Sequence, residues 1–252
     1  MTHFFSIPTF WRQADLLKTV FFTIGAFALA VGMWWSLFIA PIDYQQEHCA
    51  RIMYIHVPAA WMALGIYSLM ALLSAVDFIW KMPFFNVMAK TAAPMGFVFT
   101  AMTLVTGAIW GKPMWGTWWV WDARLTSMLV LLFLYAGYML LIETHEDPAR
   151  GARAGGLLLM VGAINIPIIK FSVQWWHTLH QPASLIKLTG PAIHISMLVP
   201  LLIMIGAYSF LFMGLWVMRI ESELIQRRIR ALEAFKRQTL DHQSREPLRQ
   251  AC

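Results

Sequence analysis

Cysteine is scarce in this sequence, and several motifs that mark enzymes are missing from it. The 252 residues include two cysteines, Cys49 and Cys252, and no CxxC motif, which argues against a dithiol redox function. There is no GxxxxGKS/T motif, so we expect that the chain does not hydrolyse nucleotides itself. A serine elbow, an HExxH motif and paired catalytic carboxylates in an exposed loop are also missing. Together these absences predict a protein that is not an enzyme.

Charged residues are also scarce, at 13% of the chain, whereas 59% of the residues are hydrophobic and the mean hydropathy is +0.61. These values lie outside the range of soluble proteins and indicate a polytopic membrane protein in contact with lipid. The formal net charge of +6 does not predict a nucleic-acid partner, because the basic residues lie at the ends of apolar segments. The N-terminus shows no signal-peptide cleavage pattern, so we expect its first apolar run to remain as a membrane helix.

Six apolar runs are long enough to span a membrane, since about 20 apolar residues cross the hydrocarbon core. The sequence therefore predicts an all-α polytopic membrane protein with six transmembrane helices. They are expected at 18–40, 52–80, 91–109, 125–142, 154–173 and 189–217. We expect a short turn at 81–90, a charged loop at 143–153, and a separate surface helix from Arg219 onward. The chain is thus divided into a membrane domain, 1–218, and a charged cytoplasmic tail, 219–252.

The distribution of lysine and arginine predicts which side of the membrane each loop occupies. An even number of spans places both termini on the same side. That side carries fourteen basic residues, eight in the tail and two each in the N-terminal lead, the 81–90 turn and the 143–153 loop. The opposite side carries five. The positive-inside rule therefore predicts that both termini are cytoplasmic and that the loops after the third and fifth spans face outward.

Tryptophan is concentrated in one stretch between the third and fourth spans. Trp110–Asp122, WGKPMWGTWWVWD, contains five of the 13 tryptophans. They are Trp110, Trp115, Trp118, Trp119 and Trp121. Two glycines and Pro113 are expected to keep the start of the stretch from forming a simple helix. An aromatic belt at the lipid headgroups needs far fewer tryptophans. Five of them beside the charged pair Asp122 and Arg124 indicate a platform, 110–124, for a large, flat, apolar ligand.

Two histidines flank this stretch on the predicted outer face. His56 lies at the mouth of the second span, two residues before Pro58, and His180 lies in the loop after the fifth span beside a tryptophan pair. Two imidazoles around a tryptophan platform suit a flat ligand with a metal at its centre. Haem fits this description, because each neutral imidazole offers a nitrogen to one axial position of the iron. Arg51 and Arg124 could bind the propionates bidentately.

Two further histidines leave alternatives open. His177 and His180, spaced i and i+3, would share one face of a helical turn and could form a zinc or copper site. A third ligand for such a site could be Glu47, His48 or Cys49. His194 is expected inside the sixth span, either as a spare ligand for the metal or in a hydrogen bond to a neighbouring helix.

The tryptophan-rich stretch and its surroundings resemble a known family. The run WGKPMWGTWWVWDARLT is similar to the signature of the haem-handling membrane proteins of cytochrome c biogenesis, which is a long and specific pattern. Within this group, the six spans and the segments RIMYIHVPAAW and NIPIIKFSVQWWHTLHQ resemble the C subunit of the cytochrome c maturation system. The similarity runs from about Pro41 to Gln181 and is strongest at 100–135.

This resemblance implies a haem-binding assembly factor of the bacterial cell inner membrane. Proteins of the family bind b-type haem non-covalently at the periplasmic face and pass it to a membrane-anchored haem chaperone (CcmE). They are associated with ABC-transporter subunits (CcmA and CcmB) and a small single-span subunit (CcmD). Carried over to this chain, the resemblance assigns the axial ligands to His56 and His180 and the platform to Trp110–Asp122. His177 has no counterpart in the family pattern.

A haem permease or exporter subunit that moves haem across the membrane is the main alternative. It would need a polar or broken-helix path near the membrane midplane, whereas these spans show few charges and no clear inverted repeat. A purely structural scaffold would not need His56 and His180 on one face. We therefore predict a haem carrier that delivers its cargo to the chaperone.

Overall fold

Every regular element of the described chain is helical. The computed structural model describes residues 7–176, 178–180 and 193–250. Its elements are α1 (Ile7–Trp34), the π-helix η1 (Trp35–Ile39), the 3-10 helix η2 (His48–Ile52), α2 (Met53–Trp80), α3 (Pro83–Trp115), α4 (Ala123–Thr144), α5 (Pro148–Gly162), α6 (Asn165–Trp175) and α7 (Ile195–Gln250). The predicted all-α class is confirmed.

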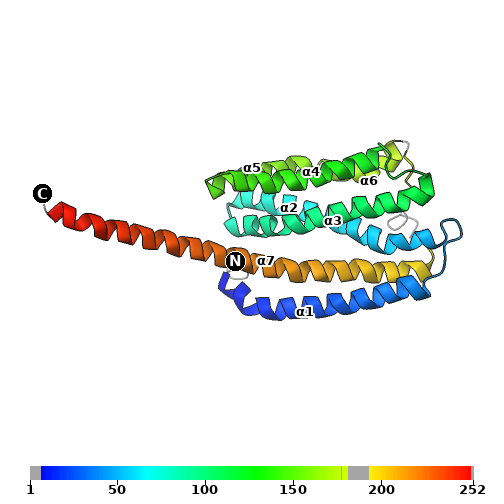
Figure 1. Cartoon of the computed structure of the whole chain (residues 1–252), viewed down its shortest axis with the longest axis horizontal. Helices are drawn as coiled ribbons and strands as arrows, with labels where there is room; N and C mark the ends of the chain where they lie inside the picture. Colours follow the sequence, from blue (N-terminus) through cyan, green and yellow to red (C-terminus); the bar gives the residue numbers. More distant parts are fainter. Residues whose placement is uncertain (1–6, 177, 181–192, 251–252) are drawn as a thin grey trace.

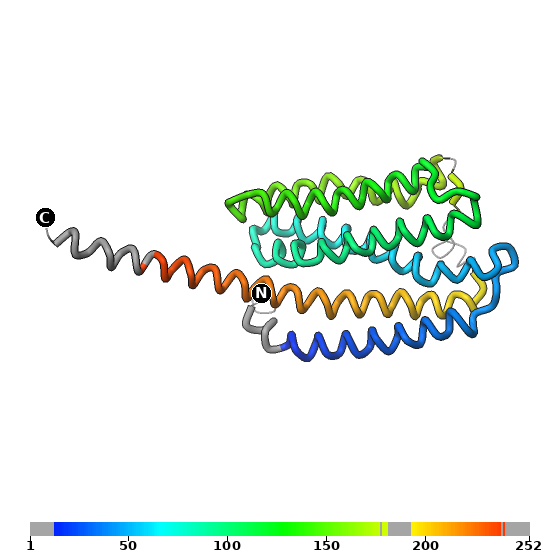
Figure 2. Tube along the Cα trace, viewed as in Figure 1, coloured from blue at the N-terminus to red at the C-terminus, as the bar shows by residue number. Residues whose placement is uncertain are grey.

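Six helical stretches within the described residues are long and apolar enough to cross a membrane. They are Gln13–Ile39, His48–Trp80, Pro83–Trp115, Ala123–Thr144, Pro148–Trp175 and Ile195–Arg237. They run roughly parallel in one bundle, in which the first and last spans, α1 and α7, lie side by side (Figure 2). The predicted number of spans is therefore confirmed by the length and composition of the helices.

Two connections are shorter than the sequence predicts. α3 begins at Pro83, so most of the predicted 81–90 turn is helical, with proline at the first position, where a backbone N–H is not needed. Lys81 adopts the left-handed conformation, at φ 52°, that ends α2. The predicted 143–153 loop shrinks in the same way, because Pro148 starts α5. In both cases a proline within the predicted connection marks the first residues of a helix.

The predicted fifth span consists of two helices. The regular helix is interrupted for two residues between α5 and α6, although Ala163 and Ile164 keep right-handed helical backbone angles. The span predicted at 154–173 is therefore confirmed as one stretch of membrane length, but it is not one uninterrupted helix. Pro167 explains the break, because in a continuous helix its ring would clash with the carbonyl group of Ala163. At the break, the buried Asn165 donates from Nδ2 to the carbonyl oxygen of Ser127 in α4 at 2.8 Å. This bond fixes α6 against α4.

The charged tail is not a separate helix. α7 continues without a break for 56 residues, and its C-terminal part extends beyond the bundle (Figure 1). The described part contains no glycine after Arg219 and is rich in residues of high helix propensity. Ion pairs hold α7 where it leaves the bundle: Glu221 pairs with Lys18 of α1, and Glu223 pairs with Lys90 of α3 at 2.9 Å. The division of the chain into two domains stays a prediction.

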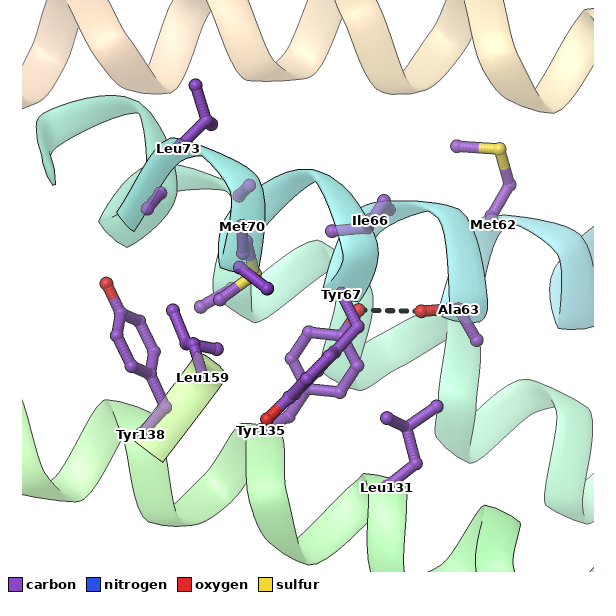
Figure 3. Packing of buried hydrophobic residues seen from close by; sticks show 14 of the residues in the cluster. Met62, Ala63, Ile66, Tyr67, Met70, Leu73, Leu131, Tyr135, Tyr138 and Leu159 are labelled. Atoms are coloured by element: carbon purple, nitrogen blue, oxygen red, sulfur yellow. Dashed lines mark hydrogen bonds between the residues drawn. The ribbon is translucent and has the colours of Figure 1, made fainter. Parts of the chain in front are cut away.

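The core lies where α2, α3, α4 and α5 meet. Tyr67 and Tyr135 are fully buried there and contact each other edge to face at 5.1 Å (Figure 3). The hydroxyl group of Tyr135 donates to the carbonyl oxygen of Ala63 at 2.7 Å, which joins α4 to α2. Gly96 of α3 makes room for the Tyr135 ring, because a Cβ atom at this position would overlap it. These contacts fix α3 relative to its neighbours.

The two ends of the bundle differ in the connections that lie there. The end from which α7 extends carries the short α2–α3 and α4–α5 connections (Figure 1). The opposite end carries the connection between η1 and η2, the α3–α4 connection and the end of α6. We call this second end, formed by residues 40–52, 110–124, 175–176 and 178–180, the tryptophan end.

Candidate functional site

The tryptophan-rich stretch is part helix and part loop. α3 continues to Trp115 and is ended by Gly116, whose φ of 76° is left-handed and whose N–H donates to the Lys112 carbonyl oxygen at 3.0 Å. Pro113 lies inside the last turn of α3, so the prediction of a non-helical start is wrong. Gly111 is buried in this helix, and a Cβ atom there would meet the Trp115 ring at 2.9 Å. Glycine at this position lets the indole lie against the helix.

The five indoles do not form one open surface. Trp118 and Trp121, in the loop, are 58% and 75% exposed, whereas the other three are half-buried. Trp119 packs edge to face with Trp121 at 5.4 Å between ring centroids. Trp110 donates from Nε1 to Oε1 of Gln46 at 2.9 Å, which joins α3 to the η1–η2 connection. Trp118 and Trp121 therefore offer exposed ring area, whereas Trp110 and Trp115 pack at the end of α3.

His56 lies near the start of α2 with its ring against α3. Its Nδ1 is 3.0 Å from Oγ1 of Thr106, and its ring meets Trp110 edge to face at 5.7 Å. The Thr106 hydroxyl donates its proton to the Met102 carbonyl oxygen at 2.7 Å, so it accepts from the imidazole. The hydrogen of neutral His56 is then on Nδ1, and Nε2 carries a lone pair.

His180 is paired with the carboxylate of Asp122. The distance between Nδ1 of His180 and Oδ2 of Asp122 is 2.9 Å, and the ring of Trp115 lies 4.8 Å from the imidazole. The other carboxylate oxygen accepts from the backbone N–H of Leu125 at 2.8 Å and caps α4. The imidazole donates from Nδ1, so in His180 too the lone pair is on Nε2.

Burial lowers the pKa of His180 below its ordinary value, and the hydrogen bond to Asp122 opposes this shift without cancelling it. A lowered pKa means that the imidazole is neutral at pH 7. Neutral imidazole is the form that binds a metal ion.

The structure brings both histidines to the last turns of α3. His56 contacts Trp110 and His180 contacts Trp115, so the two rings lie at the same end of one helix. His56 is also close enough to His180 and Arg124 to interact with them electrostatically. Within the described residues, neither Nε2 atom has a hydrogen-bond partner in the protein. The structure therefore places two imidazoles with unpartnered Nε2 atoms at the same end of α3.

The two arginines differ in what they contact. Arg51 donates from its terminal nitrogens to the carbonyl oxygens of Leu37 and Ala40, which satisfies the end of η1. Arg124 donates from Nε to Oγ of Ser172 at 3.3 Å. In the described part of the chain, no protein group accepts from the terminal nitrogens of Arg124. Arg124 is therefore the better placed of the two to bind a carboxylate of a ligand.

The spare histidine candidates gain no support. His177 lies outside the described residues. His194 precedes α7 instead of lying inside a span, and its Nδ1 is 2.8 Å from Oγ of Ser196 in the next turn. No bond from His194 to a neighbouring helix occurs among the described residues, so its role stays a prediction. The predicted helix start at 189 lies outside the described residues. No cluster of three or more His, Cys, Asp or Glu side chains suited to a metal ion occurs among the residues that the structure describes.

Sequence reasoning missed the partners that hold the candidate ligands. Thr106 lies in an apolar run, Gln46 in a polar loop and Ser172 near the end of a span, and none has a distinguishing pattern. Asp122 was predicted as part of the platform, whereas it caps α4 and orients His180. Its position directly before an apolar helix is a recognisable N-cap signal. Its pairing with His180 has no signal in the sequence.

Comparison with known proteins agrees with the resemblance seen in the tryptophan-rich stretch. Residues 1–235 match the family described as "CcmC: Heme exporter protein C". The Heme exporter protein C of Bradyrhizobium diazoefficiens is 48% identical over 208 residues, covering 82% of this chain and 79% of that protein. The protein of the same name from Haemophilus influenzae is 45% identical over 218 residues, covering 86% and 89%. That of Escherichia coli K12 is 53% identical over 153 residues, covering 61% and 62%. The chain therefore belongs to the heme exporter protein C family.

Proposed function

We propose that this protein binds haem at the tryptophan end of the bundle and delivers it to a periplasmic haem chaperone during cytochrome c maturation. His56 and His180 are the axial ligands of the iron, and the exposed indoles of Trp118 and Trp121 cover part of the macrocycle. The haem is b-type and held without a covalent bond. The name of the relatives, heme exporter protein C, supports haem as the cargo.

The hydrogen bonds of His56 and His180 are the main support for haem binding. Two histidines from different parts of the chain lie at the end of α3, each with Nδ1 engaged and with Nε2 free of protein partners among the described residues. A histidine that binds a metal almost always donates its other ring nitrogen to a protein acceptor, which fixes the ring and its tautomer. Both His56 and His180 follow this pattern.

The surroundings of the two ligands also suit haem. The exposed loop tryptophans offer flat apolar surface for the ring. The terminal nitrogens of Arg124 are available to pair with a propionate, because a guanidinium group matches a carboxylate in two parallel hydrogen bonds. Arg51 is committed to backbone carbonyl groups, so its contribution is to hold the neighbouring chain.

The basic residues support a periplasmic position for the tryptophan end. The start of α1 and the far part of α7 lie at the opposite end of the bundle (Figure 1), and that end carries most of the lysine and arginine. In the inner membrane of a bacterium, the tryptophan end then faces the periplasm, where the chaperone CcmE can approach it. Nucleotide hydrolysis is left to the ABC subunits CcmA and CcmB, with CcmD as a further membrane partner. The protein itself acts as a carrier, not as an enzyme.

The absorption spectrum of the detergent-purified protein tests haem binding. Protein produced together with its partners is expected to show the Soret band and the visible bands of low-spin haem with two histidine ligands. A colourless preparation, obtained under conditions in which the chaperone is loaded with haem, would overturn the proposal.

A transport assay separates the carrier from a permease. In vesicles that contain only this protein and enclose haem, we expect no haem to appear outside, with or without the chaperone. Haem already bound at the tryptophan end should instead pass to the chaperone when it is added on that side. Chaperone-independent release through the bilayer, absent from vesicles without the protein, would favour the permease instead.

Haem binding is expected to weaken on acidification. Burial lowers the pKa of His180 below its ordinary value of 6.5, so at pH 7 the ring is neutral and protons do not compete with iron. Affinity should therefore be constant above about pH 6.5 and fall only below it, as Nε2 becomes protonated. NMR titration of the haem-free protein should give a His180 midpoint below 6.5. A midpoint above about 7 would contradict the prediction.

A further inference from the structure

The two candidate axial ligands have unequal partners. His180 donates from Nδ1 to a carboxylate oxygen of Asp122 at 2.9 Å, whereas His56 donates to the hydroxyl oxygen of Thr106 at 3.0 Å. The distances are nearly the same, but the acceptors differ in charge. A hydrogen bond to an ionised acceptor is roughly twice as strong as one between neutral groups. The two imidazoles are therefore held with different strengths.

Asp122 is a fixed acceptor. It is only 8% exposed, and its other oxygen accepts from the Leu125 N–H at the start of α4. The carboxylate cannot rotate away from His180 without losing this helix cap. The ring of Trp115 lies on another side of His180, at 4.8 Å. Asp122 thus holds both the orientation of the imidazole and the position of its proton.

Thr106 is a weaker acceptor. Its hydroxyl proton is already committed to the carbonyl oxygen of Met102 at 2.7 Å. These are neutral groups of α3, and they fix the tautomer of His56 without adding negative charge. They cannot draw the Nδ1 proton away from the ring as a carboxylate does.

We infer that His180, activated by Asp122, is the stronger iron ligand and that His56 is the ligand that leaves when haem is handed over. This inference rests on the proposed function and deepens it. A carboxylate that accepts from Nδ1–H increases the basicity of Nε2, and removing such a partner typically lowers metal affinity about 10–100-fold. Asp122 is a positioning residue in this scheme. The haem stays anchored at His180 while the His56 side of the site opens.

The substitution Asp122→Asn gives a sharp test, because it keeps the helix cap and reverses the hydrogen bond to His180. The amide oxygen still accepts from Leu125, and the NH₂ group now donates to Nδ1. The proton of neutral His180 must then move to Nε2, where it blocks the iron. Titration of haem into the haem-free variant should show affinity lowered by about 10–100-fold. Thr106→Val should lower affinity by less than about tenfold, and Thr106→Ser, which retains the hydroxyl group, should match the wild type.

Carbon monoxide identifies the weaker ligand directly. Bound to the ferrous haem of the wild type, it replaces the more weakly held histidine, and the resonance Raman frequencies of the iron–CO unit report the ligand that remains. We expect the wild-type spectrum to match that of His56→Ala, in which CO lies opposite His180, and to differ from that of His180→Ala. This comparison does not depend on Asp122→Asn being able to fold.

A wild-type CO spectrum that matches His180→Ala instead would overturn the inference and leave the proposed function standing. Equal losses of affinity in Asp122→Asn and Thr106→Val would overturn it as well. If the wild type binds no haem at all, the proposed function fails first and the inference fails with it.

Discussion

Replacing both His56 and His180 with alanine is expected to abolish the low-spin haem spectrum of the purified protein. Low-spin haem with two histidine ligands requires an imidazole on each side of the iron. The rings of His56 and His180 both have free Nε2 atoms and lie at the same end of α3. Each single variant should retain part of the haem in a high-spin form with one histidine ligand. The double variant should keep only what the tryptophan surface holds, with almost no Soret absorbance after detergent washing.

His48→Ala is the matched control for these variants. His48 is an exposed histidine at the same end of the bundle, at the start of η2, so its removal should leave the spectrum unchanged. Exogenous imidazole should restore the low-spin spectrum of each single variant, because it can fill the vacant axial position. An unchanged spectrum in His180→Ala would refute its role as a ligand and would make His177 or His194 the second ligand to test.

Gly96→Ala is expected to lower the free energy of unfolding by about 1–3 kcal/mol, the usual cost of overpacking a core. The added Cβ atom would overlap the ring and hydroxyl group of Tyr135, which is fully buried and bonded to the Ala63 carbonyl oxygen. The ring cannot move aside without breaking that bond and its contact with Tyr67. Thermal unfolding in detergent should therefore show a clear loss of stability. The haem spectrum should also change, because α3 carries Trp110 and Trp115.

Gly65→Ala provides the comparison for this substitution. Gly65 lies on the exposed side of α2, and a Cβ atom added there would meet no other atom within 4 Å. Alanine at this position should therefore be neutral or stabilising by up to about 1 kcal/mol.

Combining Gly96→Ala with Tyr135→Leu should lower the free energy of unfolding by less than the sum of the two separate losses, because the smaller side chain removes the overlap. If the loss in the double variant equalled the sum of the two single losses, the overlap between the added Cβ atom and the Tyr135 ring would have to be relieved in some other way.

Hydropathy predicted the membrane class and the number of spans. Both are properties of the local sequence, because a span needs only enough consecutive apolar residues to cross the bilayer. The predicted helix boundaries were wrong at three prolines. Pro83 and Pro148 lie in predicted connections but start helices, and Pro167 lies at a break within a predicted helix. Proline fits the first turn of a helix as well as a loop, and the sequence around it does not tell the two apart.

The family could likewise be identified from one stretch of sequence, because the tryptophan-rich pattern is long and specific. His56 and His180 were selected from the same kind of local information. Their roles as ligands stay a prediction, but the structure places both rings against the end of α3, as the selection requires. The exposure of the individual tryptophans was not predictable, since α3 continues further into the stretch than its glycines and proline suggest.

The class of protein, its family and the residues worth testing can therefore be read from local sequence. Which side chains orient those residues depends on how the helices pack. Asp122 meets His180 across 58 positions of sequence, and Thr106 meets His56 across 50. Such pairs depend on how α2, α3, α4 and the end of α6 pack together, and a buried hydrogen bond needs its two atoms within about 3 Å of each other. No local pattern encodes that distance, so the unequal partners of the two histidines become visible only in the folded chain.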